Sequence, residues 1–183
     1  IGWASFPAGI IGLFWGDVIE QELRNPTFVA WNLLFWSFVF FAAERYSANQ
    51  KSTEPNIARM TLGQVLFIGF AQAIALLPGT SRSGITISGG LLANLSPATA
   101  ARFSFLLGTP IILAAGAYKT LHLLPSSIDS VHLSNSQLGV GLFVSFVVGY
   151  FSIKLLLRIV SRLGLMPFIV YRIILATSIL VLF

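Results

Sequence analysis

The chain has 183 residues, of which 56% are hydrophobic and only 9% are charged, and its formal net charge is +5 at pH 7. Soluble domains carry about 25% charged residues, so this composition excludes a soluble globular protein and predicts an integral membrane protein. The absence of cysteine excludes disulfides and cysteine-ligated metal sites. Basic residues occur in short clusters between apolar runs, which is typical of membrane topology signals and argues against a nucleic-acid partner.

Seven apolar segments follow one another along the chain and predict an all-α, polytopic helix bundle that forms a single transmembrane domain over residues 1–183. The segments are 1–16, 27–43, 62–77, 84–95, 98–118, 137–157 and 164–183. Because the chain begins inside an apolar segment and without Met, we expect it to be truncated at the N-terminus. The positive-inside rule places connections 44–61 and 154–163 in the cytoplasm, and connections 17–26 and 119–136 outside.

The sides assigned to these connections agree with the number of membrane crossings only if segments 62–77 and 84–95 form a re-entrant helical hairpin. This hairpin, over residues 62–95, enters the membrane from the cytoplasm and returns to the same side. A helix over 62–77 would be about 24 Å long, whereas the hydrocarbon core is about 30 Å thick. We therefore expect Pro78 to end the first helix and the tip to lie within the outer half of the membrane. Non-helical backbone at that depth has to be buried in protein or line a polar cavity.

The predicted tip carries the residue types of an oxyanion site. Gly79 and Gly84 let the backbone turn and approach a ligand closely. Arg82 offers a planar fork that suits two phosphate oxygens, and the helix that follows presents its N-terminus. An arginine at this depth costs at least about 2.5 kcal/mol, which helix capping alone does not explain. The predicted catalytic residues are Arg82 and Ser81, and the predicted phosphate-binding residues are Thr80, Ser83, Gly84 and Thr86.

The run Pro78-Gly79-Thr80-Ser81-Arg82-Ser83-Gly84-Ile85-Thr86 resembles the P-G-x-S-R-S-x-x-T signature of undecaprenyl-pyrophosphate phosphatases, the bacitracin-resistance membrane proteins. The likeness continues through Ile87–Gly90, Phe103–Leu107 with Pro110, Pro167-Phe168 and Tyr171-Arg172. Gln72 stands where the family carries Glu or Gln, and the resemblance adds it to the phosphate-binding residues. The earlier family motif E-G-x-x-E-F-x-P-x-S-S-x-G-H does not occur, so the resemblance implies the second half of an inverted-repeat fold and half of a catalytic site.

The resemblance implies hydrolysis of undecaprenyl pyrophosphate to undecaprenyl phosphate and inorganic phosphate. That reaction recycles the lipid carrier for peptidoglycan synthesis and confers bacitracin resistance. The implied setting is the bacterial inner membrane, with the site facing the periplasm, a polyprenyl pyrophosphate lipid as partner and Mg²⁺ or Ca²⁺ as cofactor. Since the acid–base residues belong to the absent motif, we expect this chain alone to be inactive. The sequence leaves open the nucleophile, the metal ligands and whether two copies form a homodimer.

Two other classes of function fit part of the pattern. A lipid-phosphate transporter or flippase would bind the same head group without chemistry, and transporters also place helix N-termini against an anion. A lipid phosphatase of the acid-phosphatase type would need a His beside its Ser-Arg pair and a further His and Asp downstream, and the tip has neither. Arg172, about 7 Å into the last helix, is expected either to snorkel to the surface or to form a structural ion pair, outside the site.

Overall fold

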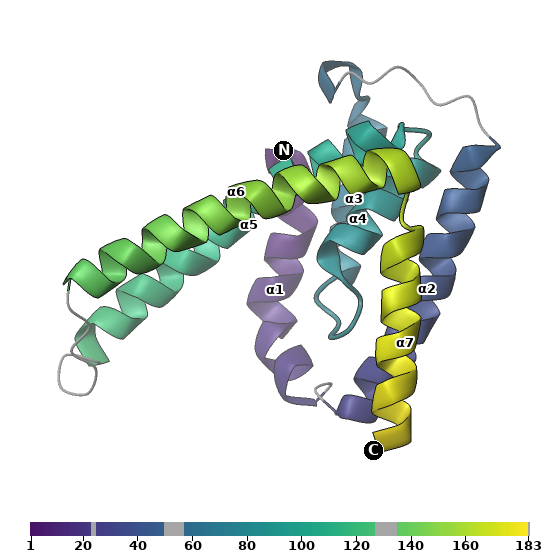
Figure 1. The fold of residues 1–183 in the computed structure, drawn as a ribbon. Coiled ribbons are helices and arrows are strands. Elements are labelled where there is room, and N and C mark those ends of the chain that lie inside the picture. Colours follow the sequence, from purple (N-terminus) through teal and green to yellow (C-terminus); the bar gives the residue numbers. More distant parts are fainter. Residues whose placement is uncertain (23–24, 50–56, 127–134, 183) are drawn as a thin grey trace.

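The structure, a computed structural model, describes residues 1–22, 25–49, 57–126 and 135–182. In this part of the chain, all seven long elements are α-helices and no strand occurs, which confirms the all-α class (Figure 1). The helices are α1 (Gly2–Glu22), α2 (Pro26–Ala48), α3 (Leu62–Ile74), α4 (Arg82–Leu92), α5 (Pro97–Ser126), α6 (Asn135–Leu163) and α7 (Met166–Leu182), with a 3₁₀ turn η1 (Ile57–Arg59) before α3.

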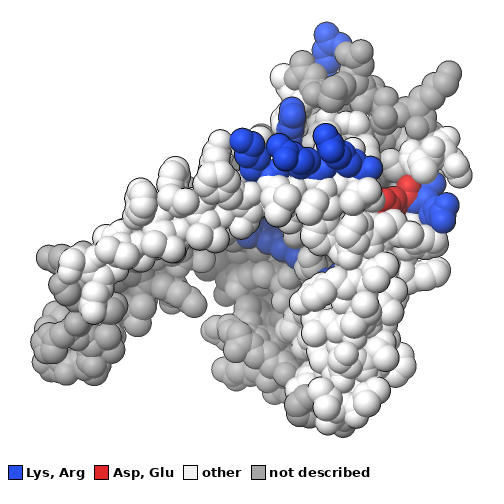
Figure 2. Space-filling model, in the orientation of Figure 1, with Lys and Arg blue, Asp and Glu red and all other residues white. Residues whose placement is uncertain are grey.

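Three helices in the described ranges are long and apolar enough to cross a bilayer: Pro26–Ala48, Pro97–Ala117 and Ser136–Leu163. Helices α3 and α7 are apolar but shorter. The surface of α6 is covered with exposed large apolar side chains such as Phe143 and Phe146, as expected for a helix that faces lipid. Basic side chains gather at one end of the molecule, over the end of α6 and near the end of α2 (Figure 2). This end, which includes Arg45, Arg158 and Arg162, is called the basic end below, and the chain is a multi-pass membrane protein.

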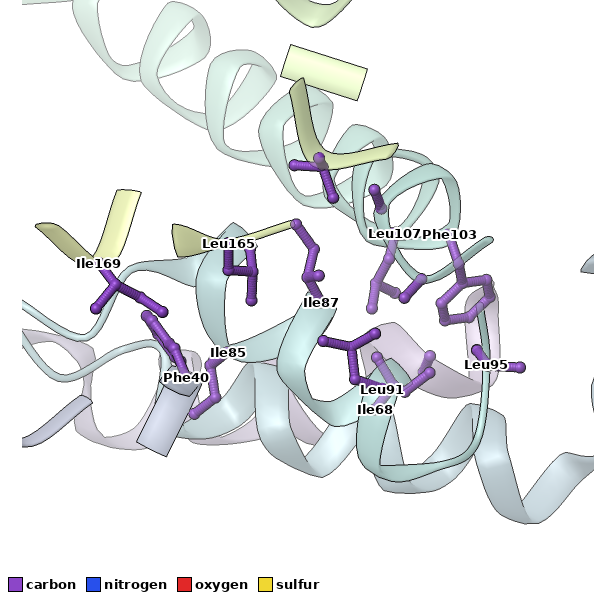
Figure 3. Packing of buried hydrophobic residues seen from close by; sticks show 14 residues of the cluster. Phe40, Ile68, Ile85, Ile87, Leu91, Leu95, Phe103, Leu107, Leu165 and Ile169 are labelled. Carbon is purple, nitrogen blue, oxygen red and sulfur yellow. The ribbon is translucent and has the colours of Figure 1, made fainter. Parts of the chain in front are cut away.

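Helix α4 lies at the centre of the molecule, in contact with α2, α3 and α5. All its residues from Gly84 to Leu91 are buried, as expected for a helix that is surrounded by other helices on every side. Its apolar side chains pack in one core with Phe40, Ile68 and Leu107 from three neighbouring helices (Figure 3). Outside this centre, α1 packs on α3, α2 packs on α7, and α5 and α6 project together away from the bundle (Figure 1).

Helices α3 and α4 run antiparallel and form a hairpin whose open side faces the basic end. A capping box between Thr61 and Gln64 starts α3, and Gln64 Nε2 also donates to Ala93 O at 2.9 Å, which joins the two helices. With 13 and 11 residues, the helices are only about 20 Å and 17 Å long. The tip consequently ends short of the far ends of α1, α2 and α7 (Figure 1).

The boundaries of the hairpin tip differ from the predicted ones. Helix α3 ends at Ile74, four residues before Pro78, and α4 begins at Arg82, two residues before Gly84. A proline ring clashes with the carbonyl four residues earlier and disfavours helical geometry at the preceding residue, so Pro78 interrupts the helix upstream of itself. Tighter turn bonds replace the helical ones, for example from Leu77 N to Ile74 O at 3.1 Å. As a result, Arg82 stands in the first turn of a helix.

Candidate functional site

The backbone of the tip bends sharply to bring the start of α4 to the end of the hairpin. Gly79 and Ser81 both have left-handed backbone angles, with φ of +87° and +71°. Glycine adopts this conformation freely, whereas serine does so at a cost, and such strained residues cluster at ligand-binding sites. Ser81 is the N-cap of α4, and its Oγ accepts a hydrogen bond from Gly84 N at 3.3 Å. Since this contact uses only the oxygen, the Ser81 hydroxyl proton is free to donate to a ligand.

Arg82 is half-buried and bridges two helices. Its Nη2 donates to Gly108 O in α5 at 3.0 Å, and its Nε donates to Gln72 Oε1 in α3 at 3.3 Å. A guanidinium has five N–H donors, so three of them are left for an anion. Gln72 is only 2% exposed, and within the described ranges its Nε2 has no hydrogen-bond partner. An unpaired buried amide costs about 1–3 kcal/mol, which is consistent with an acceptor arriving from a ligand or another segment.

The four predicted hydroxyls divide into two groups. Ser81 and Ser83 line a cavity of about 200 Å³, together with Gly84 and side chains of α2, α6 and α7. Thr80 is fully buried and its Oγ1 accepts from Asn32 Nδ2 at 3.0 Å. Thr86 donates to Arg82 O at 2.8 Å, and its Oγ1 lies 2.6 Å from Ser104 Oγ. The structure thus brings the six predicted side chains and Gly84 into one region, and a direct phosphate contact by Thr80 or Thr86 stays a prediction.

Two residues that the sequence analysis did not assign to the site hold the tip in place. Asn32 Nδ2 donates to Pro78 O at 2.6 Å as well as to Thr80. Arg172 Nη2 donates to Gly79 O at 2.8 Å, so α2 and α7 each bind one carbonyl of the tip. Both residues interrupt apolar segments, and a polar side chain inside such a segment was the available signal.

Arg172 adopts neither of the two arrangements expected for it. It is 8% exposed, so it does not snorkel to the surface, and its recorded partners are neutral. Besides Gly79 O, its Nε donates to Ser37 Oγ at 3.2 Å, and its guanidinium lies 5.0 Å from the centroid of the Phe40 ring. It also lines the cavity of Ser81 and Ser83. A buried arginine is held here by backbone carbonyls and an aromatic face.

The Mg²⁺ or Ca²⁺ that the resemblance implies prefers several oxygen ligands, mostly carboxylates. The described residues contain no group of three or more His, Asp or Glu side chains that could hold a metal ion. The side chains at the tip are hydroxyls, the amides of Asn32 and Gln72 and the guanidinium groups of Arg82 and Arg172, a set that repels a cation more than it binds one. The described residues of this chain therefore do not form a metal site on their own.

The geometry defines the class of protein: a polytopic membrane protein with a helical hairpin whose tip is buried in the bundle, carries Arg82 in the first turn of α4 and is held from α7 by Arg172. The family model "Bacitracin resistance protein BacA" matches residues 1–178, and the chain belongs to this family.

Similar curated proteins carry a common description. The chain is 43% identical over 99% of its length to the "Undecaprenyl-diphosphatase" of Chromohalobacter salexigens, which it covers to 67%. It is 40% identical over 96% of its length to the protein of the same description from Saccharophagus degradans, covered to 63%. It is 39% identical over its full length to "Undecaprenyl-diphosphatase 2" of Stutzerimonas stutzeri, covered to 68%. The chain thus spans about two thirds of the length of these relatives.

At Gly84, helix α4 packs closely against Phe40 of α2. A Cβ built there would lie 2.5 Å from Phe40 Cε2, and Phe40 is itself 2% exposed beneath Arg172. We expect Gly84→Ala to destabilise the protein by about 1–3 kcal/mol, because the buried Phe40 ring or helix α4 has to shift to relieve the contact. Thermal unfolding in detergent measures this, and Phe40→Leu should restore part of the stability. Gly139→Ala, where nothing lies within 4 Å, is the matched control, and an equal loss there would contradict the packing argument.

Proposed function

We propose that this chain provides the phosphate-binding half of the active site of a bacterial undecaprenyl-pyrophosphate phosphatase. The reaction converts undecaprenyl pyrophosphate to undecaprenyl phosphate and inorganic phosphate, recycles the carrier lipid for peptidoglycan synthesis and confers bacitracin resistance. The observation that carries the proposal is Arg82, which is half-buried, keeps three donors unused and stands in the first turn of a buried helix. The descriptions of the relatives support the choice of substrate.

In the proposed complex the terminal phosphate lies at the N-terminus of α4. Arg82 binds two of its oxygens, and the first-turn N–H groups of α4, which have no helical acceptor, bind from the helix end. The hydroxyls of Ser81 and Ser83 donate to the remaining oxygens. An oxygen nucleophile forms the new bond to the terminal phosphorus while the bond to the bridging oxygen breaks, and the bond electrons leave on undecaprenyl phosphate. Arg82 and Ser81 act by stabilising the negative charge on the transferring phosphoryl group.

The cavity beside the tip supports a lipid substrate. It begins at Ser81 and Ser83 and continues between apolar side chains, among them Leu156, Leu165 and Phe168. A pyrophosphate that carries a prenyl chain would place its charged end on the hydroxyls and its first hydrocarbon units between these side chains. Free pyrophosphate would leave the apolar wall uncovered.

Hydrolysis also needs a group that activates the nucleophile and one that stabilises the leaving oxygen. Arg82 stays protonated, Gln72 does not titrate, and the serine hydroxyls need a base beside them. We assign the base, and the ligands of Mg²⁺ or Ca²⁺, to the segment by which the relatives exceed this chain. That segment also explains the buried Gln72 Nε2, because it would bring acceptors to the tip.

The second candidate is a transporter or flippase of the same lipid, because a helical hairpin with its helix N-terminus aimed at an anion is also a transporter arrangement. Release of phosphate distinguishes the two. The test combines the chain, in detergent, with the segment of the Chromohalobacter salexigens relative that lies outside the matched part. This combination should release phosphate from undecaprenyl pyrophosphate. Binding of the lipid without release would support the transporter.

We place the protein in the inner membrane, with the basic end in the cytoplasm and the hairpin tip accessible from the periplasm. The chain has no cysteine, so single-cysteine variants report topology on a clean background. Ser136→Cys, exposed at the start of α6, should react with a membrane-impermeant thiol reagent in intact cells. Asn49→Cys, exposed at the end of α2, should react only after the membrane is permeabilised, and the opposite pattern would reverse the placement.

A further inference from the structure

A second basic site lies at the basic end, between α5 and α6 and away from the hairpin tip. A cavity of about 330 Å³ is lined there by Ala98 and Arg102 of α5 and by Leu157, Arg158, Ser161 and Arg162 of α6. Three of its six lining residues are arginines, and they come from the start of one helix and the end of the next.

Helical spacing accounts for this arrangement. Ala98 and Arg102 are four residues apart, as are Arg158 and Arg162, so each pair lies on one face of its helix. The two faces meet where the start of α5 lies beside the end of α6, and the small Ala98 leaves room between the guanidinium groups. Ser161, whose Oγ donates to Arg158 O at 3.0 Å, adds a hydroxyl to the wall.

Like charges at this spacing repel one another, so an anion would stabilise the cluster. No carboxylate lines the cavity. Glu44, the one acidic residue whose side chain the structure describes, lines a neighbouring cavity together with Ser161 and Arg162. Its Oε1 accepts a hydrogen bond from Leu165 N at 3.0 Å, and its Oε2 has no hydrogen-bond partner among the described residues, so it does not pair with any of these arginines. Among the described residues, the three guanidinium groups therefore have their N–H donors available.

The surroundings of the cavity indicate a lipid as the source of that anion. Directly toward the membrane interior, α6 exposes Phe151 and Leu155, and α5 exposes Leu106. The arginines thus stand at the border between an apolar, lipid-facing surface and the polar end of the molecule. Basic pockets between transmembrane helices at this level suit the phosphate of an anionic head group, and arginine binds phosphate oxygens in pairs.

We propose that Arg102, Arg158 and Arg162 form a binding site for the phosphate of one anionic phospholipid, such as phosphatidylglycerol, with its acyl chains along the exposed apolar surface of α5 and α6. The site lies apart from the hairpin tip and does not depend on the function proposed for it. Ser161 donates to the same phosphate through its hydroxyl when it releases Arg158 O.

Native mass spectrometry of the detergent-purified chain, titrated with dioleoyl-phosphatidylglycerol, tests the proposal. We expect one tightly bound phosphatidylglycerol, and at least tenfold weaker binding in the double variant Arg102→Gln/Arg162→Gln. The double variant Arg45→Gln/Arg59→Gln removes the same number of charges from exposed positions outside the cavity and should bind as the unchanged chain does. Equal losses in the two double variants would overturn the site, because net charge alone would then explain the binding.

Two further measurements identify the source of the phosphate, and a single variant replaces the double variant if the latter does not fold. Phosphatidylcholine should bind at least tenfold more weakly than phosphatidylglycerol, and inorganic phosphate at millimolar concentration should not displace the lipid. Displacement by inorganic phosphate, or equal binding of phosphatidylcholine, would overturn a lipid site. If the double variant fails to purify, the single variant Arg162→Gln takes its place, and unchanged phosphatidylglycerol binding in it would count against the proposal.

Discussion

Replacing Arg82 by lysine should lower the turnover of the assembled enzyme about 100-fold or more, although the positive charge is kept. Arg82 bridges Gln72 Oε1 and Gly108 O and still has three donors for the phosphate. A lysine ammonium has three donors on a single atom, so it cannot keep both bridges and bind two phosphate oxygens. Loss of an oriented donor to the transferring group costs about 10²–10³ in kcat. Phosphate release from undecaprenyl pyrophosphate under saturating substrate measures it.

The ratio of effects on kcat and KM tells what Arg82 does. If Arg82 binds the transition state more tightly than the ground state, Arg82→Lys lowers kcat and leaves KM nearly unchanged. Arg45→Lys, at the basic end and far from the tip in the fold, is the matched control and should keep full activity. Turnover close to that of the unchanged enzyme in Arg82→Lys would show that the residue contributes only its charge, and the bidentate contact would then have no part in catalysis.

The second large effect is the expected inactivity of the 183-residue chain by itself. Expressed alone, it should insert in membranes and release no phosphate, since the tip has donors for the phosphate and no group that accepts a proton from the nucleophile. Co-expression with the uncovered segment of a relative should raise phosphate release from background to a measurable rate. The assay is the same in both cases, and the Arg82→Lys variant of the combined protein is the control for activity from other phosphatases.

One outcome would contradict the half-site interpretation directly. His122 belongs to the predicted outer connection 119–136, and its side chain is not among those that the structure describes. Phosphate release by the chain alone that is abolished in His122→Ala would show that this connection supplies a base to the tip. The assignment of the base to another segment would then be wrong, while the role of Arg82 as the phosphate ligand would stand.

The seven helices and the hairpin could be predicted from the sequence because they depend on local properties. An apolar run has to be helical in lipid to satisfy its own backbone, so the length of each run gives each helix. The predicted runs match the observed helices in number and order within the described ranges, and the largest shift is at the end of α5, which continues to Ser126 where the run was predicted to end at residue 118. The signature residues also lie next to one another in the chain, so their gathering at the start of α4 needs no tertiary information.

The support of the tip was decided by the tertiary structure alone. Asn32 binds Pro78 O across 46 positions, Arg82 binds Gly108 O across 26, and Arg172 binds Gly79 O across 93. In the sequence, Arg172 is one basic residue inside the last apolar run, and the cost of burying it does not reveal its partner. Those partners are mostly backbone carbonyls, which every residue carries, so no side-chain pattern marks them. Only the packing of α2, α5 and α7 around the hairpin selects which carbonyls the tip exposes and which side chains reach them.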